Sequence, residues 1–238
     1  MPAVTVVFDL DGTLVDTAPD LVDTLNVVFT QEGLPTVPFD KARNLIGGGA
    51  RRMIERGLQA EGRSCAPADI DRLFGQFIEY YAAHIADRSR PFPGLDRALD
   101  RLAADGARFA VCTNKLEWLA KKLLDALDLS PRFHAICGQD TFGIQKPNPE
   151  ILRRTVQRAG GTLERTVMVG DSGSDVVTAR AAGVPIVAVD FGYTEIPVAR
   201  LEPDGLISGF DQLPAAVDDV LGRVAGAADA QVSAATAR

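Results

Sequence analysis

The stretch that decides the fold is Val4-Thr5-Val6-Val7-Phe8-Asp9-Leu10-Asp11-Gly12-Thr13-Leu14, near the start of a chain of 238 residues. Its first five residues are apolar or β-branched and do not alternate in polarity, which is typical of a strand buried on both faces of a parallel sheet. Open α/β sheets bind ligands at the carboxyl ends of such strands, where Asp9 and Asp11 lie. Side chains two apart in extended chain point to the same side, so both carboxylates can face one ligand.

Similar apolar runs recur at residues 108–112, 166–169 and 185–189, each after a helical pattern. In the helix expected after Asn114, apolar residues recur at helical spacing and form one buried stripe. Strands that alternate with helices indicate βαβ units. The sequence therefore predicts an α/β fold with a Rossmann-like, doubly wound parallel sheet.

Residues 17–90 follow another pattern, because helical stripes occur there without a convincing strand between them. The stripes consist of Leu21, Leu25, Val28 and Phe29, of Met53, Ile54 and Leu58, and of Leu73, Phe77, Tyr80 and Tyr81. Two prolines and a glycine at 91–94 would end this segment. We expect an α/β core of residues 1–16 and 91–222, a small inserted α-helical cap domain of residues 17–90, and an Ala-rich, frayed or loosely helical tail of residues 223–238.

The net charge of −7 and the lack of a long basic run argue against nucleic acid or an anionic membrane as partners. No apolar window approaches the length of a membrane span, and no signal segment opens the chain, so we expect a cytoplasmic protein. The three cysteines lack metal-ligand spacing and are expected to be reduced and inert. The sequence leaves open whether the chain is a monomer or a homodimer.

Aspartate and glycine are common turn residues, so Asp9 to Gly12 alone could merely end a strand. The full stretch resembles the first motif of the haloacid dehalogenase superfamily, and three further motifs of that superfamily follow in order. Thr113 answers to the second motif and Lys146 to the third, while Asp171 and Asp175 answer to the fourth. Singly, these residues could be helix caps or a solvated loop lysine, but their joint order favours the functional interpretation.

The resemblance implies a phosphatase in which Asp9 attacks phosphorus and becomes an aspartyl phosphate, while Asp11 serves as general acid and then as general base. Thr113, Asn114 and Lys146 would bind the phosphate. A cation must separate the carboxylate nucleophile from the phosphate dianion, and Mg²⁺ prefers oxygen ligands. Asp9, the backbone carbonyl of Asp11, and Asp171 would bind it, with Asp175 supporting these ligands from behind.

The segment Gly47-Gly48-Gly49-Ala50-Arg51-Arg52 lies between two expected cap helices. Its glycines would let backbone amides approach a small anion beside an arginine, although a flexible loop with solvated arginines is an equal alternative.

With Thr113-Asn114-Lys115 and Phe191-Gly192-Tyr193, this loop resembles that of bacterial phosphoglycolate phosphatases, which implies 2-phosphoglycolate, a small phosphorylated metabolite, as substrate. Another sugar or nucleoside phosphatase, a phosphomutase and a non-catalytic magnesium- or phosphate-binding regulator remain alternatives. Asp11 argues against a dehalogenase, which has no alkoxide to protonate.

Overall fold

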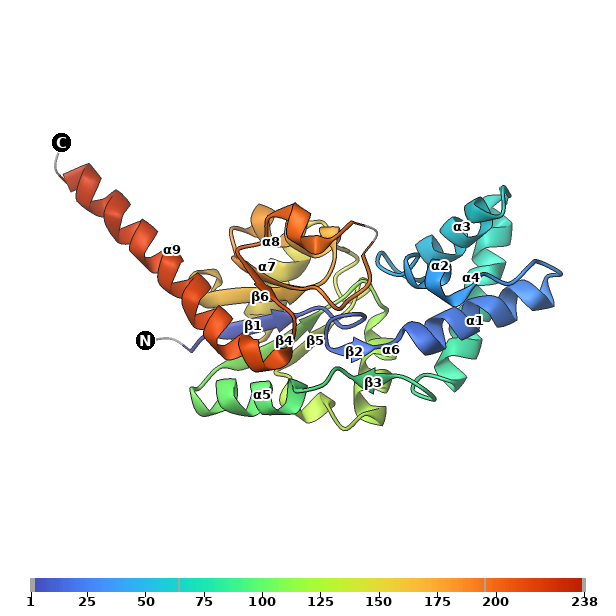
Figure 1. Ribbon diagram of the computed structural model, residues 1–238, viewed down its shortest axis with the longest axis horizontal. Helices are drawn as coiled ribbons and strands as arrows, with labels where there is room; N and C mark the ends of the chain where they lie inside the picture. The colour runs from blue at the N-terminus through green and yellow to red at the C-terminus, as the bar shows by residue number, and fades with distance from the viewer. Residues whose placement is uncertain (1–2, 64, 195, 237–238) are drawn as a thin grey trace.

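The computed structural model describes residues 3–63, 65–194 and 196–236. At its centre lies a parallel sheet of six strands in the order β5-β4-β1-β6-β7-β8 (Figure 1). The strands are β1 (Thr5–Phe8), β4 (Arg108–Cys112), β5 (Ala135–Cys137), β6 (Thr166–Gly170), β7 (Ile186–Val189) and β8 (Gly205–Ile207). The predicted parallel α/β sheet is confirmed. The edge strands β5 and β8 were not predicted, because three residues are too few to show a pattern.

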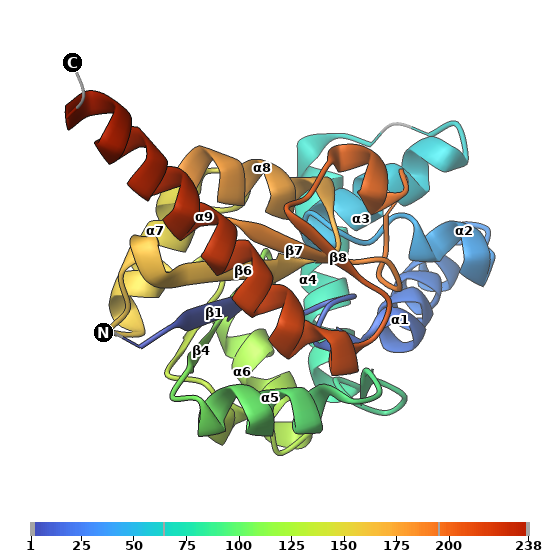
Figure 2. The same cartoon turned by 60° about the vertical axis from the view of Figure 1, so that its left-hand side comes forward.

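Helices cover both faces of the sheet, as a doubly wound fold requires (Figure 2). One face packs Val6 and Phe8 against helices α5 (Leu95–Ala104), α6 (Glu117–Ala126) and α9 (Leu213–Thr236). The other packs Val7 against α7 (Pro149–Arg158) and α8 (Gly173–Ala182). Short 3₁₀ turns complete the core at Ser130–Arg132, Leu163–Arg165, Val198–Leu201 and Phe210–Gln212. Because neighbouring residues of β1 point to opposite faces, its unbroken apolar run is explained.

Four helices lie together beyond the carboxyl ends of the strands (Figure 1). They are α1 (Ala18–Gln31), α2 (Phe39–Arg43), α3 (Ala50–Ala60) and α4 (Pro67–Ala83). The chain enters and leaves this group through two short antiparallel strands, β2 (Val15–Asp16) and β3 (Arg90–Pro91). Buried Asp20, in α1 shortly after β2, links the two connecting segments. It accepts hydrogen bonds from the backbone N–H of Ser89 at 2.7 Å and from the Ser89 hydroxyl at 2.6 Å, directly before β3.

Helix α9 begins against the sheet and continues away from it through the Ala-rich segment to Thr236 (Figure 1). Residues 237 and 238 of the predicted tail lie outside the described residues. None of the helices in the described part of the chain combines the length and apolar character needed to cross a bilayer. All three cysteines are free thiols, and Cys112 and Cys137 are buried.

Candidate active site

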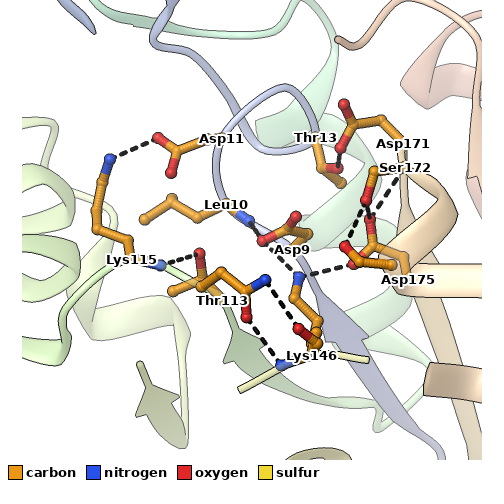
Figure 3. A network of polar contacts seen from close by, with 12 residues as sticks. Asp9, Leu10, Asp11, Thr13, Thr113, Lys115, Lys146, Asp171, Ser172 and Asp175 are labelled. Atoms are coloured by element: carbon orange, nitrogen blue, oxygen red, sulfur yellow. Dashed lines mark hydrogen bonds and ion pairs between the residues drawn. The ribbon is translucent and has the colours of Figure 1, made fainter. Parts of the chain in front are cut away.

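Asp9 follows β1 directly, at the carboxyl edge of the sheet between the ends of β4 and β6 (Figure 3). The backbone N–H of Leu10 donates to Asp9 Oδ1 at 2.7 Å, and Lys146 Nζ lies 2.9 Å from the same oxygen. Burial raises the pKa of Asp9 to about 6, and this effect outweighs the opposite effect of the Lys146 ammonium, which lowers the pKa. Without a further cation, the ionised carboxylate is therefore costly to hold here.

Lys146 supplies the only cation in direct contact with Asp9 among the ion pairs of the described residues. Its side chain is 1% exposed, and Nζ also donates to Asp175 Oδ1 at 2.6 Å. The side chain of Asn114 fixes the Lys146 backbone, with Oδ1 accepting from the backbone N–H at 2.8 Å and Nδ2 donating to the carbonyl at 3.2 Å. The Asn114 amide thus positions the lysine, and a direct phosphate contact from Asn114 would have to use its backbone N–H.

Asp171 and Asp175 complete a cluster with Asp9 in which one carboxylate oxygen from each lies within 4.8 Å of the others. Asp171 accepts from the Thr13 hydroxyl at 2.8 Å and from the Tyr193 backbone N–H at 2.7 Å. Its pKa is raised well above the ordinary value, chiefly by burial and then by the charges of Asp175 and Asp9. Three buried carboxylates face one buried ammonium, and a divalent cation fits this excess of negative charge and this oxygen-only donor set.

Asp175 differs from Asp171 in that it accepts a hydrogen bond from the Lys146 ammonium. One Asp175 oxygen accepts from Lys146, and the other accepts from the Ser172 backbone N–H at 3.0 Å and from its hydroxyl at 2.6 Å. The interaction with Ser172 forms a capping box at the start of α8, with the carboxylate held by its own helix terminus. Asp175 is thereby better placed to hold Lys146 than to bind a metal ion.

Gly12 is required where the backbone passes the acidic cluster. Its φ is +81°, a conformation that favours glycine, and a Cβ there would lie 2.5 Å from Asp171 Oδ2 and 2.9 Å from Tyr193 Cδ2. The turn is closed by the backbone hydrogen bond from Gly12 N–H to Val15 O at 3.0 Å. The Asp9 to Val15 loop can therefore approach Asp171 only because this residue has no side chain.

The side chain of Asp11 lies away from this cluster and faces Lys115 (Figure 3). Lys115 Nζ is 2.7 Å from Asp11 Oδ1, which also accepts from the Thr17 hydroxyl at 2.8 Å. Lys115 Nζ also donates to the hydroxyl of Tyr81 from α4 at 3.1 Å and lies 4.6 Å from the centre of its ring. Lys115 and Tyr81 were not predicted as site residues. Two features of the sequence could have indicated them. Lys115 directly follows Thr113-Asn114, and Tyr81 belongs to a buried helical stripe.

Thr113 lies at the end of β4, as predicted, and is 1% exposed. Its backbone N–H donates to Cys137 O at 3.0 Å, and its hydroxyl accepts from the Lys115 backbone N–H at 3.2 Å. The hydroxyl hydrogen is therefore available to a ligand in the cavity that Thr113 lines.

A cavity lies between the sheet edge and the α-helical group. Its polar floor includes Asp9, Asp11, Thr113, Asn114, Lys115 and Asp171, and its opposite wall is mainly apolar, from Leu21, Ile46, Met53, Phe74, Phe77 and Ile78. The predicted loop residues Gly47, Gly48 and Gly49 line it, with φ values of 101°, 123° and 88°. Backbone groups of this loop can thus come close to a bound ligand.

Arg51 and Arg52 do not line this cavity, which fits the alternative of solvated arginines better than an arginine beside the anion. Arg51 forms an ion pair with Asp71 and lies over the ring of Phe74, with 47% of its side chain exposed. Arg52 is exposed as well. Both begin helix α3, and the helix turns their long side chains towards solvent instead of towards the floor.

A buried aspartate is paired with a lysine at the carboxyl edge of a doubly wound sheet, beside a carboxylate cluster and under a helical insertion. This is the arrangement expected of a hydrolase that uses a carboxylate as nucleophile. The profile of the haloacid dehalogenase-like hydrolases matches residues 6–189. The chain belongs to this family.

Several relatives are similar over nearly the whole chain. The phosphoglycolate phosphatase of Mesorhizobium japonicum is 47% identical over 221 residues, covering 93% of this chain and 97% of that protein. A structure from Haemophilus somnus 129PT, described as a predicted phosphoglycolate phosphatase, superimposes with a TM-score of 0.82 at 27% identity and covers 90% of this chain and 97% of its own. The structure of CbbY from Rhodobacter sphaeroides in complex with phosphate superimposes with a TM-score of 0.77 at 25% identity. The match covers 92% of this chain and 100% of that chain.

Proposed function

We propose that the protein is a phosphoric monoester hydrolase that converts 2-phosphoglycolate and water to glycolate and phosphate. The observation that carries the proposal is the arrangement at the cavity floor, where Asp9 lies 2.9 Å from buried Lys146 and Asp11 faces the same cavity. The names of the relatives, at up to 49% identity over 89% of the chain, support the choice of substrate.

In the first half of the reaction, a carboxylate oxygen of Asp9 forms a bond to phosphorus, and the bond from phosphorus to the ester oxygen breaks. Asp11 gives its proton to that oxygen, and glycolate leaves. In the second half, water attacks phosphorus of the aspartyl phosphate while Asp11 accepts its proton, and the bond to Asp9 breaks. Asp11 is thereby restored to its protonated form, and inorganic phosphate is released.

Lys146, Thr113 and Asn114 would bind and orient the phosphoryl group. The Lys146 ammonium offsets charge on the transferring group and on Asp9 together, which helps two anions to approach each other. The Thr113 hydroxyl can donate to a phosphoryl oxygen, because its acceptor side is used by Lys115 N–H. The side chain of Asn114 holds Lys146 in place by hydrogen bonds to the Lys146 backbone.

We propose Mg²⁺ as the cofactor, held by Asp9, the backbone carbonyl of Asp11, and Asp171. Bound there, it would neutralise phosphate charge between the carboxylate nucleophile and the dianion. The raised pKa values of Asp9 and Asp171 support this, because burial, and after it the charges of neighbouring carboxylates, disfavours their ionised forms, and a bound cation would offset that cost. Asp175 holds Lys146 and would support the site without binding the ion.

The α-helical residues 17–90 are proposed to act as a cap that excludes water and selects the substrate. The glycine loop at 47–49 and the apolar wall form their side of the cavity. A cavity of this kind suits a small phosphorylated metabolite.

The test is a phosphatase screen of the purified chain with Mg²⁺ and with EDTA. It compares 2-phosphoglycolate with a panel of sugar and nucleoside phosphates. We expect activity only with the metal ion and a preference for 2-phosphoglycolate of at least about tenfold, or about 1.4 kcal/mol of transition-state binding. A smaller preference would favour a phosphatase for another small phosphate ester, and turnover in EDTA would contradict the metal assignment.

A further inference from the structure

The proposed substrate has a negative charge at each end, but the described catalytic groups account for only one. The phosphate would lie at Asp9 and Lys146. The carboxylate needs a cation or several donors of its own, since an unpaired charge in a largely apolar cavity is costly. The cavity wall formed by the cap is mainly apolar and offers no cation from Arg51 or Arg52.

Lys115 is the only lysine or arginine among the described residues that line the cavity. The other nearby cation, Lys146, lies beneath the floor, with its side chain 1% exposed and its ammonium shared between Asp9 and Asp175. Resting on the proposed function, we propose that Lys115 recognises the carboxylate of the substrate and makes the enzyme selective for phosphate esters of 2-hydroxy acids.

The geometry around Asp11 fits this role. In 2-phosphoglycolate, one carbon atom separates the ester oxygen from the carboxylate carbon. The group that binds the carboxylate must therefore lie next to the acid that protonates the ester oxygen. Lys115 Nζ lies 2.7 Å from Asp11 Oδ1, so one substrate of this length can reach both groups.

Lys115 also has a donor to spare. An ammonium group has three N–H donors, and the contacts with Asp11 and the Tyr81 hydroxyl occupy two. The Tyr81 ring, 4.6 Å from Nζ, stabilises the positive charge where burial would otherwise oppose it. The Tyr81 hydroxyl accepts from Lys115, which leaves its own hydrogen free to donate to the same carboxylate.

Tyr81 belongs to helix α4 of the cap, whereas Lys115 and Asp11 belong to the core. A carboxylate bound at Lys115 would therefore be bound by both parts of the chain at once. An ester of the same length that ends in a hydroxyl instead of a carboxylate would offer Lys115 only an uncharged acceptor, and its contact with the ammonium would be weaker.

The experiment compares two substrates of the same length, 2-phosphoglycolate and 2-hydroxyethyl phosphate, which differ in the carboxylate. Kinetics with Mg²⁺ are measured for the wild type and for Lys115→Met, Lys115→Gln and Lys115→Arg. Lys122→Met, at an exposed lysine on the following helix α6, is the control. The decisive quantity is the ratio of kcat/KM for the two substrates.

We expect Lys115→Met and Lys115→Gln to lower this ratio by about tenfold to a hundredfold, the range for a charge-assisted hydrogen bond. Lys115→Arg should keep most of the preference, and Lys122→Met should match the wild type. Equal losses on both substrates would show that Lys115 only positions Asp11 and would overturn the inference alone. A wild type without preference between the two substrates would overturn the proposed function as well. Because Gln keeps a polar group beside Asp11, it tests the inference even if Met impairs folding.

Discussion

Replacing Asp9 by Asn is expected to abolish hydrolysis and, in the absence of metal, to change how stability depends on pH. The variant removes the proposed nucleophile and one negative charge from a cluster of three buried carboxylates, while retaining the size of the side chain. Wild-type Asp9 has a pKa raised from 3.8 to about 6 by burial, so its ionised form is disfavoured by the fold. The proposed nucleophile thereby costs stability at neutral pH.

The sign and size of the expected change in stability with pH follow from proton linkage. Between pH 3.8 and about 6, the folded chain holds a proton on Asp9 that the unfolded chain has lost, so stability falls as pH rises through this window. The full effect is about 3 kcal/mol, because each pKa unit corresponds to about 1.4 kcal/mol. Only the upper part of the window is crossed between about pH 5.5 and about pH 7.5, which leaves about 1 kcal/mol.

The assay is urea unfolding in EDTA at these two pH values, followed by circular dichroism. From the lower to the higher pH, the free energy of unfolding of Asp9→Asn should improve by about 1 kcal/mol relative to wild type. Asp125→Asn, at an exposed position on α6, serves as control and should follow the wild type. A variant that loses stability relative to wild type as the pH rises would refute the reasoning, because the ion pair with Lys146 would then outweigh the cost of burial.

Two further substitutions test the surroundings of Asp9. Lys146→Met leaves buried carboxylates without their cation and should lower the free energy of unfolding in EDTA at neutral pH by about 3–5 kcal/mol. Added Mg²⁺ should reduce this loss of stability. A loss below about 1 kcal/mol in EDTA would contradict the assigned charge balance. Gly12→Ala should weaken Mg²⁺ binding by at least about tenfold in calorimetry, because its Cβ would lie 2.5 Å from Asp171 Oδ2. Gly106→Ala, with φ of +82° and nothing within 4 Å, carries the same backbone strain without the contact, and an equal effect on Mg²⁺ binding would refute this explanation.

Much of the fold and the core of the site could be predicted because they depend on local signals. The apolar run of β1 shows burial on both faces, and polar residues directly after β1, β4 and β6 indicate one edge of the sheet. Asp9, Thr113 and Asp171 lie there for this reason. Lys146 is less local, since it follows no strand directly, and only its family motif indicated it.

The direction of long side chains could not be predicted in the same way. Arg51 and Arg52 lie next to the glycine loop in sequence, yet their helix turns them away from the cavity. Lys115 was indicated in the sequence only by its position after Thr113-Asn114. Its side chain lies in the cavity because Asp11 and Tyr81 hold it there. Such placement depends on contacts between residues that are 34 and 104 positions apart, which no local pattern contains.

Tyr193 shows why the Phe191-Gly192-Tyr193 segment belongs to the site even though it carries no reacting group. Its backbone N–H donates to Asp171 Oδ2 at 2.7 Å, and its hydroxyl accepts from the Ala18 backbone N–H at 2.9 Å and donates to Asp16. One residue thus joins the proposed metal ligand to the strand by which the chain enters the cap. A shift of the cap at this crossing would displace the tyrosine and, through it, a ligand oxygen. The Tyr193 contacts provide a physical link through which the proposed selection of substrate by the cap can affect the proposed catalytic centre.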